Sequence, residues 1–178
     1  SAVALATGMA ALELGSDIGA SIRNPAHYCG VFGHKPTMSL VPFEGHVVPG
    51  MLPEVDISVC GPLARSAADL DLALSVLAGP TGMNSTGYQV ALPEARQTGL
   101  SEFKVAVMLD TPVIENDSVM LDQLQNAVDA LAEAGCVVEE ATPQIDQYEY
   151  FENYLMLLRA ATGAQSNDEV FSAALEGS

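Results

Sequence analysis

Residues 103–140 contain the pattern that most limits what this chain can fold into. The apolar stretch Phe103–Leu109 is typical of a β-strand, and Asp117 then begins a segment with leucines at helical spacing that ends at Gly135. Cys136–Glu140 predicts a second strand. A strand–helix–strand unit joins parallel strands through a right-handed crossover. We therefore expect an α/β fold.

The rest of the chain predicts further helices and strands separated by turns. Residues 2–13 are rich in alanine and leucine and predict a helix interrupted by glycine, and residues 14–25 predict a loop. Residues 57–63 are expected to form a short strand, and Ser66 is expected to cap the helix that follows. Residues 147–162 predict an amphipathic helix.

Two segments carry weaker predictions. Residues 38–56 are rich in proline and glycine and predict a long irregular loop of the kind that often carries a site. Another short helix is expected from Asn167 onward.

The charge of the chain excludes several classes of partner. Lysine and arginine total 6 and aspartate and glutamate total 23, which gives a net charge of −17. Binding to a nucleic-acid backbone needs a basic surface, and so does a basic helix that lies on a membrane. The sequence contains no apolar window long enough for a transmembrane helix. We therefore expect neither a nucleic-acid nor a membrane partner.

The cysteines and histidines predict neither a disulfide framework nor a metal site. The three cysteines are widely spaced and odd in number, which favours reduced thiols in a cytoplasmic protein. The three histidines fit no short metal-ligand motif, and we expect no cofactor. These residues are Cys29, Cys60, Cys136, His27, His34 and His46.

The segment that can carry chemistry runs from Gly15 to Arg23. Its small residues allow a sharp turn in which consecutive backbone N–H groups converge on one point and bind an oxyanion. Ser21 would present its hydroxyl beside that point as a nucleophile, and Asp17 and Arg23 could hold the two arms of the turn together. The alternative is an ordinary turn in which Ser21 caps the helix that begins near Arg23.

Two longer segments form a recognisable pattern. The first comprises SAVALATG and LGSDIGASIRNPAHYCGVFGHKPT within residues 1–37, and the second is CGPLARSAADLDLALSVLAGP at residues 60–80. Both segments resemble the amidase signature family of serine hydrolases. The resemblance implies a mixed β-sheet flanked by helices on both faces. Residues 1–178 would form part of that domain, with a signature core at 1–80, the β-α-β continuation at 101–142 and terminal helices at 147–178.

The resemblance also implies a site and a reaction. Ser21 aligns with the family's nucleophile, and the oxyanion-binding amides align with Ile18, Gly19, Ala20 and Ser21 itself. The family completes the triad with a serine in a cis peptide and a lysine, both expected upstream of Ser1, so the chain resembles an internal or C-terminal fragment. The implied activity is hydrolysis of a carboxamide C–N bond in a small-molecule substrate through an acyl-enzyme on Ser21, without a metal or cofactor.

Two residues depart from the family pattern, which has glycine at both positions. Ala20 lies directly before the predicted nucleophile, and Ser39 lies in the turn after Thr37. If Ala20 needs a positive φ, its backbone is strained by about 1–2 kcal/mol. Its methyl group could also crowd the acyl pocket.

Three alternatives to the free-standing amidase remain open. The A-type glutaminase subunit of an amidotransferase, which works with partner chains, resembles the same pattern, although residues 24–28 and the Gly45-His46 pair look closer to free-standing amidases. It could be a non-catalytic segment that associates with a second copy through apolar surface. It could also hold its own base, for which Lys35 and the histidines are the candidates.

Overall fold

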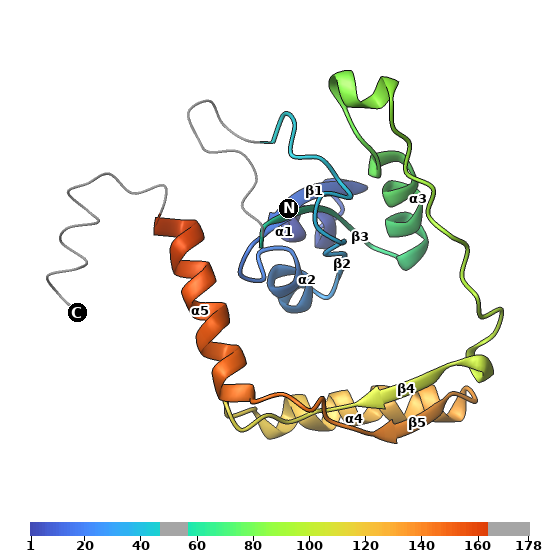
Figure 1. Ribbon diagram of the computed structural model, residues 1–178. Coiled ribbons are helices and arrows are strands. Elements are labelled where there is room, and N and C mark those ends of the chain that lie inside the picture. Colours follow the sequence, from blue (N-terminus) through green and yellow to red (C-terminus); the bar gives the residue numbers. More distant parts are fainter. Residues whose placement is uncertain (47–56, 164–178) are drawn as a thin grey trace, which may run out of the picture. The chain divides into compact units, whose positions relative to one another are not determined.

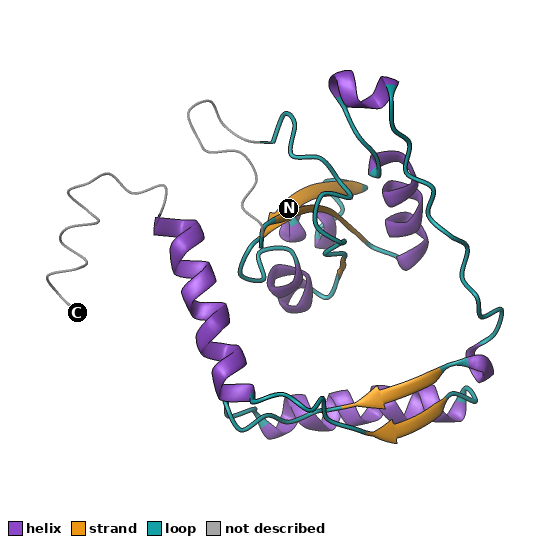
Figure 2. Cartoon of the chain, viewed as in Figure 1, coloured by secondary structure: helices purple, strands orange, loops and turns teal. Residues whose placement is uncertain are grey.

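The computed structural model describes residues 1–46 and 57–163, and its helices and strands confirm the predicted α/β class (Figures 1 and 2). The chain divides into two compact units. One comprises Ser1–Ala91 together with the chain from Leu157 onward, and the other comprises Leu92–Met156.

The first unit is built on a three-stranded antiparallel sheet with the strand order β1-β3-β2. β1 is Leu12–Asp17, β2 is Phe32–Gly33 and β3 is Val59–Ala64. Every residue of β3 is buried, as expected for the central strand. In the register of β1 and β3, Gly15 lies opposite Gly61.

Helices pack on this sheet. α1 (Ala2–Ala6) and α2 (Arg23–Cys29) contribute to an apolar core whose buried members are Ala2, Leu5, Ile22, Ala26 and Leu63. A Cβ built on Gly15 would meet Leu63 and Ile22, so Gly15 faces this core. Side chains alternate along a strand, and Leu12 and Leu14 therefore face away from it. α3 (Ala67–Leu77) packs against β3.

The helix predicted over residues 2–13 is wrong beyond its first turns. α1 ends at Ala6, Gly8 adopts a φ of +76°, and Leu12–Asp17 form β1 instead of helix and loop. The local composition favours a helix, but pairing with β3, about 50 residues away in sequence, determines the outcome. Such tertiary pairing commonly overrides local propensity.

The predictions for the following elements are confirmed. The strand expected at residues 57–63 is β3, and the Ser66 hydroxyl oxygen accepts a hydrogen bond from the Asp69 N–H at 3.1 Å as the cap of α3. α3 ends before the Gly79-Pro80 pair. Of the predicted irregular loop, residues 38–46 form turns and bends, and the remainder lies outside the described residues.

The second unit contains the predicted strand–helix–strand pattern. β4 (Lys104–Val107) and β5 (Val137–Glu140) are parallel, and α4 (Ser118–Glu133) connects them. The Asp117 carboxylate caps α4 by accepting hydrogen bonds from the N–H groups of Val119 and Met120. Gly135, with a φ of +97°, follows its end. The parallel pairing confirms the prediction.

The remaining elements are short, except for α5. The 3₁₀ helices η1 (Gly82–Thr86) and η2 (Leu100–Glu102) lie in the connection that precedes β4. α5 (Gln147–Gly163) confirms the predicted amphipathic helix, whereas the helix expected from Asn167 lies outside the described residues. None of the helices in the described ranges is long and apolar enough to cross a membrane.

Candidate active site

The predicted site lies in a tight connection between a strand and a helix. β1 ends at Asp17 and α2 begins at Arg23, so only five residues join them. Ser21 is exposed in this turn, beside the fully buried Ile22. The N-cap residue of α2 is Ile22, without a side-chain cap, so the Ser21 hydroxyl is not used to cap the helix.

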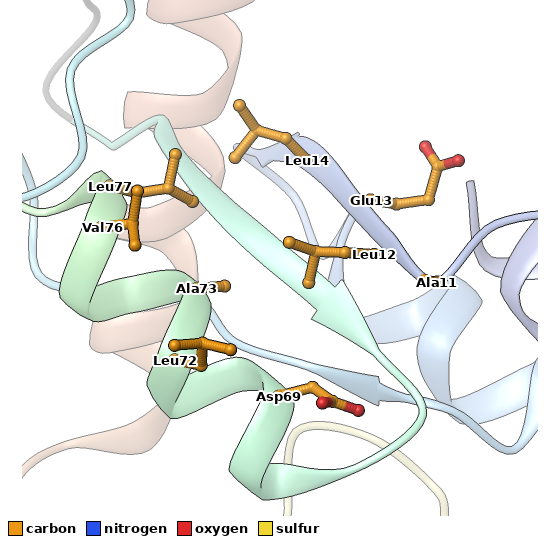
Figure 3. A pocket seen from close by; sticks show the side chains of 9 residues that line it. All are labelled: Ala11, Leu12, Glu13, Leu14, Asp69, Leu72, Ala73, Val76 and Leu77. Atoms are coloured by element: carbon orange, nitrogen blue, oxygen red, sulfur yellow. The ribbon is translucent and has the colours of Figure 1, made fainter.

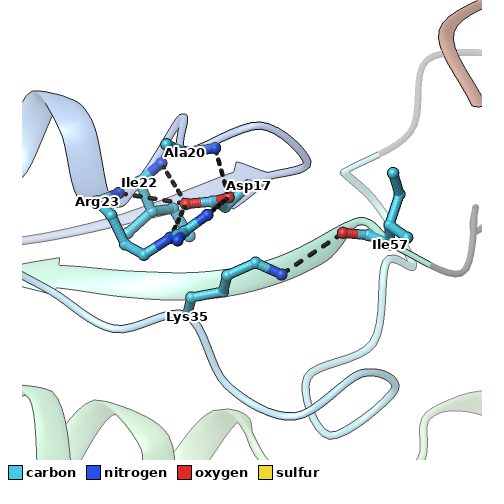
Figure 4. A network of polar contacts seen from close by, with 6 residues as sticks. All are labelled: Asp17, Ala20, Ile22, Arg23, Lys35 and Ile57. Carbon is cyan, nitrogen blue, oxygen red and sulfur yellow. Dashed lines mark hydrogen bonds and ion pairs between the residues drawn. The ribbon is translucent and has the colours of Figure 1, made fainter. Parts of the chain in front are cut away.

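The carboxylate of Asp17 organises this turn (Figure 4). Its Oδ1 accepts hydrogen bonds from the Ala20 N–H at 2.9 Å and from the Arg23 guanidinium at 3.0 Å. Its Oδ2 accepts from the N–H groups of Ile22 at 3.1 Å and Arg23 at 3.2 Å, and from Arg23 Nε at 3.0 Å. The predicted pairing of Asp17 with Arg23 is present in the structure.

The environment of Asp17 favours its charged form. Its side chain is completely buried, and burial alone raises the pKa of a carboxyl group. The hydrogen bonds from the Arg23 side chain and from the three backbone amides outweigh burial and lower the pKa of Asp17 from 3.8 to about 2. The carboxylate is therefore ionised at neutral pH and compensates the positive guanidinium.

The amide groups of the turn divide into two sets. Those of Ala20, Ile22 and Arg23 point inward and donate to Asp17. Within the described residues, no hydrogen bond is donated by the amides of Ile18, Gly19 and Ser21. Of the four amides predicted to bind an oxyanion, the Ala20 amide is thus already engaged by Asp17, and three can donate to a ligand.

Both departures from the glycine pattern occur at positive φ. Ala20 has a φ of 85° and Ser39 has a φ of 61°, and they are the two non-glycine residues with positive φ in the described part of the chain. Leu40 N–H donates to the Thr37 carbonyl at 3.1 Å, so Ser39 is the third residue of a turn in which glycine is usual. Ala20 and Ser39 therefore adopt a backbone conformation that is strained for a residue with a Cβ and unstrained for glycine.

The alternative bases have other contacts. Lys35 Nζ donates to the Ile57 carbonyl at 3.5 Å (Figure 4). The His27 ring lies against Tyr28 and the His46 ring against Phe43. In residues 1–46 and 57–163, no hydrogen bond joins Ser21 to any of these side chains, and no cluster of His, Cys, Asp and Glu is arranged to hold a metal ion.

The three cysteines are partly or fully buried. Cys60 and Cys136 are buried, Cys29 is half-buried, and none of the three forms a disulfide bond within the described part of the chain.

An apolar groove lies between β1 and α3 (Figure 3). Its volume is about 620 Å³, and its exposed apolar residues include Leu12 and Leu14 on β1 and Leu72 and Val76 on α3. Val76 is 79% exposed. Nine residues line the groove, and two of them are acidic: Ala11, Leu12, Glu13, Leu14, Asp69, Leu72, Ala73, Val76 and Leu77.

Comparisons with known proteins identify the family. A family model described as Amidase matches residues 1–176. The A-type subunit of the glutamyl-tRNA(Gln) amidotransferase of Gloeothece citriformis is 36% identical over 143 residues, which cover 79% of this chain and 29% of that protein. The protein of the same name from Salinibacter ruber is 34% identical over 171 residues, covering 94% and 32%. The chain belongs to the amidase family, and it spans about a third of the length of these relatives.

Solved structures agree with this assignment. The A-type subunit of the glutamyl-tRNA(Gln) amidotransferase of Thermotoga maritima has a TM-score of 0.73 and 25% identity, with 99% of this chain and 40% of that chain covered. A fatty acid amide hydrolase has a TM-score of 0.69 and 25% identity, with 89% and 28% covered. The chain therefore has part of the fold that these amidase-family proteins share.

The sequence does not predict that the amides of Ala20, Ile22 and Arg23 point inward. It predicted that Asp17 pairs with Arg23, but not that the same carboxylate binds three backbone N–H groups. The available signal is the short, acceptor-bearing aspartate at the start of a turn, a residue type that commonly binds nearby backbone amides.

Proposed function

We propose that the whole protein containing these residues hydrolyses a carboxamide, with Ser21 as the nucleophile. The observation that carries the proposal is the turn in which the exposed Ser21 lies beside amides that have no acceptor among the described residues. Membership of the amidase family supports the same reaction class. The reduced cysteines and the net charge support a cytoplasmic protein without a nucleic-acid ligand.

The proposed reaction has two steps. Ser21 Oγ bonds to the amide carbonyl carbon while its proton passes to a base, and the N–H groups of Ile18, Gly19 and Ser21 stabilise the tetrahedral oxyanion. The C–N bond then breaks and the amine leaves with a proton. Water attacks the resulting ester, releases the acid and restores the Ser21 hydroxyl. Each oxyanion donor in such a site typically contributes about 2.7–4 kcal/mol.

The general base that accepts the Ser21 proton is proposed here and is not one of the described residues. By resemblance we assign it to a lysine that acts through a serine in a cis peptide, both contributed by sequence outside residues 1–178. Burial and neighbouring groups would keep such a lysine neutral so that it can accept the proton. On this proposal the 178 residues form one part of a larger amidase domain.

A second candidate function is the glutaminase step of an amidotransferase. It is favoured by relatives at 34–36% identity that are named as A-type subunits of glutamyl-tRNA(Gln) amidotransferases. In that case glutamine is the amide and partner chains receive the ammonia. A requirement for partner chains distinguishes the two: a free-standing amidase hydrolyses its amide alone, whereas an amidotransferase component needs its partners for full activity.

The role of Ser21 can be tested with a fluorophosphonate probe and intact-mass measurement. We expect the full-length protein to gain one adduct, because an activated serine beside an oxyanion-binding turn attacks the phosphorus. Ser21→Ala should abolish the adduct, and Ser16→Ala, which removes a hydroxyl from β1, should retain it. An adduct that persists in Ser21→Ala would show that another serine is the reactive one.

The isolated chain of 178 residues provides a second arm of this experiment. We expect it to give no adduct, since the proposed base lies outside it. An adduct that forms on the isolated chain and disappears in Ser21→Ala would place the base within these residues. Lys35 or one of the three histidines would then have to be assigned that role.

We also propose that the isolated chain associates with a second copy through the groove between β1 and α3. Four exposed apolar side chains there, Leu12, Leu14, Leu72 and Val76, favour burial. We expect the double variant Leu72→Glu, Val76→Glu to have a lower mass by light scattering than the unmodified chain. Ser75→Glu adds charge to the same helix without removing apolar surface, and it should leave the mass unchanged. A monomeric unmodified chain would contradict the proposal.

A further inference from the structure

Ala20 holds a strained backbone that its packing does not explain. Its φ of 85° is unfavourable for a residue with a Cβ, and glycine would adopt it without penalty. The side chain is half-buried, yet Ala20 is absent from the partly buried residues that pack against the described core of the first unit, which are Ala10, Cys29 and Val31. Strain of this kind persists at functional sites because the surrounding structure enforces it.

The backbone of Ala20 is fixed on both sides. Its N–H donates to Asp17 Oδ1 at 2.9 Å, and its carbonyl accepts from the Asn24 N–H at 2.8 Å. Neither hydrogen bond can rotate away without releasing the buried carboxylate or the first turn of α2. The methyl group therefore keeps one position, in the residue directly before the exposed Ser21.

We propose that Ala20 determines substrate specificity and restricts the enzyme to amides of small acyl groups. The inference rests on the proposed function of Ser21. In the tetrahedral intermediate, the carbonyl carbon is bonded to Ser21 Oγ, and the oxyanion faces the amides of the turn. The acyl group is attached to that same carbon, so a fixed methyl on the adjacent turn residue takes up space that a longer or branched acyl group needs.

The expected change in substrate specificity is that of one methyl carbon in the substrate pocket. A single methylene difference in a substrate pocket typically changes discrimination by about 10–200-fold. We expect Ala20→Gly to raise kcat/KM for a bulky acyl amide, relative to that for acetamide, by about tenfold or more. The ratio should rise most for the longer and branched acyl groups.

The experiment measures kcat/KM of the full-length enzyme for a series of primary amides: acetamide, propionamide, butyramide and isobutyramide. Ser39→Gly is the matched control, because it also replaces a residue at positive φ by glycine, but in the turn after Thr37. We expect Ala20→Gly to change the ratio between large and small amides and Ser39→Gly to leave it unchanged.

The outcomes separate this inference from the function on which it rests. Hydrolysis that depends on Ser21, with the same acyl-size profile in wild type and Ala20→Gly, would overturn the role of Ala20 and leave the amidase proposal intact. If Ser39→Gly changed the ratio of kcat/KM between large and small amides as much as Ala20→Gly, the change would come from released backbone strain. That result would overturn the role of the Ala20 methyl group. If no amide in the series is hydrolysed by any of these proteins, both proposals fail for this substrate class.

Discussion

Replacing Gly61 by alanine is expected to destabilise the first unit by about 3 kcal/mol or more, because the added carbon has no room. A Cβ at this position would overlap the His34 carbonyl oxygen and would lie 2.7 Å from Pro36 Cδ. Neither neighbour moves easily, since His34 N–H donates to the Pro62 carbonyl at 3.0 Å and Pro36 is buried. The sheet must open locally to admit the methyl group.

The free energy of unfolding, measured by urea denaturation, checks this expectation. Gly87→Ala is the matched control, because Gly87 has a φ of −111° and a Cβ there would meet no atom within 4 Å. We expect the control to change stability by no more than about 0.5 kcal/mol. Equal stabilities for Gly61→Ala and Gly87→Ala would show that the contact between β3 and the chain at His34 is loose enough to admit a methyl group.

Replacing Asp17 by asparagine is expected to destabilise the same unit by about 3 kcal/mol, even though the side chains have the same shape. Oδ1 accepts two hydrogen bonds and Oδ2 accepts three, so either orientation of the amide turns an NH₂ group toward donors. The Arg23 side chain is about half exposed and can be solvated when the Asp17 charge is lost, which places the expected value at the lower end of the range for broken buried ion pairs.

The contribution of Asp17 also depends on pH. Because the pKa of Asp17 is lowered from 3.8 to about 2 on folding, its stabilising effect is fully present above about pH 5 and is lost progressively as the pH falls through 2 toward about 1. The shift corresponds to about 2.5 kcal/mol. The difference in unfolding free energy between wild type and Asp17→Asn should therefore narrow by about 1.8 kcal/mol between pH 4 and pH 2, because part of the effect is lost only below pH 2.

Asp71→Asn provides the control for charge alone. Asp71 is exposed on α3, and its replacement removes the same charge from a chain with a net charge of −17. We expect it to change stability little and with no comparable pH dependence in this range. A constant difference between wild type and Asp17→Asn across these pH values would refute the lowered pKa.

The features that could be predicted from the sequence are those determined by neighbours in the chain. Ser66 and Asp117 cap the helices that follow them, and both caps are confirmed. The parallel pairing of β4 and β5 follows from the length and composition of the crossover between them. The assignment of Ser21 as nucleophile stays a prediction, and in the structure the turn that carries it joins β1 to α2.

Features that depend on distant contacts could not be predicted. The sequence of β1 predicts the end of a helix and the start of a loop, because its first leucine follows an alanine-rich segment and its glycine and serine are typical of turns. Only pairing with β3 selects the strand. The positive φ of Ala20 is another feature of this kind. Neighbouring residues leave that angle open, and in the folded turn it is 85°.

The five hydrogen bonds on Asp17 have a consequence for the entropy of ligand binding. A flexible turn would lose conformational freedom each time a ligand bound, and that loss would weaken binding. Here the residues from Ala20 to Arg23 are already ordered by a carboxylate that lies inside the protein. Their entropy is lost once, when the chain folds, and on the proposed function a substrate that approaches Ser21 meets a turn whose backbone is already ordered from Ala20 to Arg23.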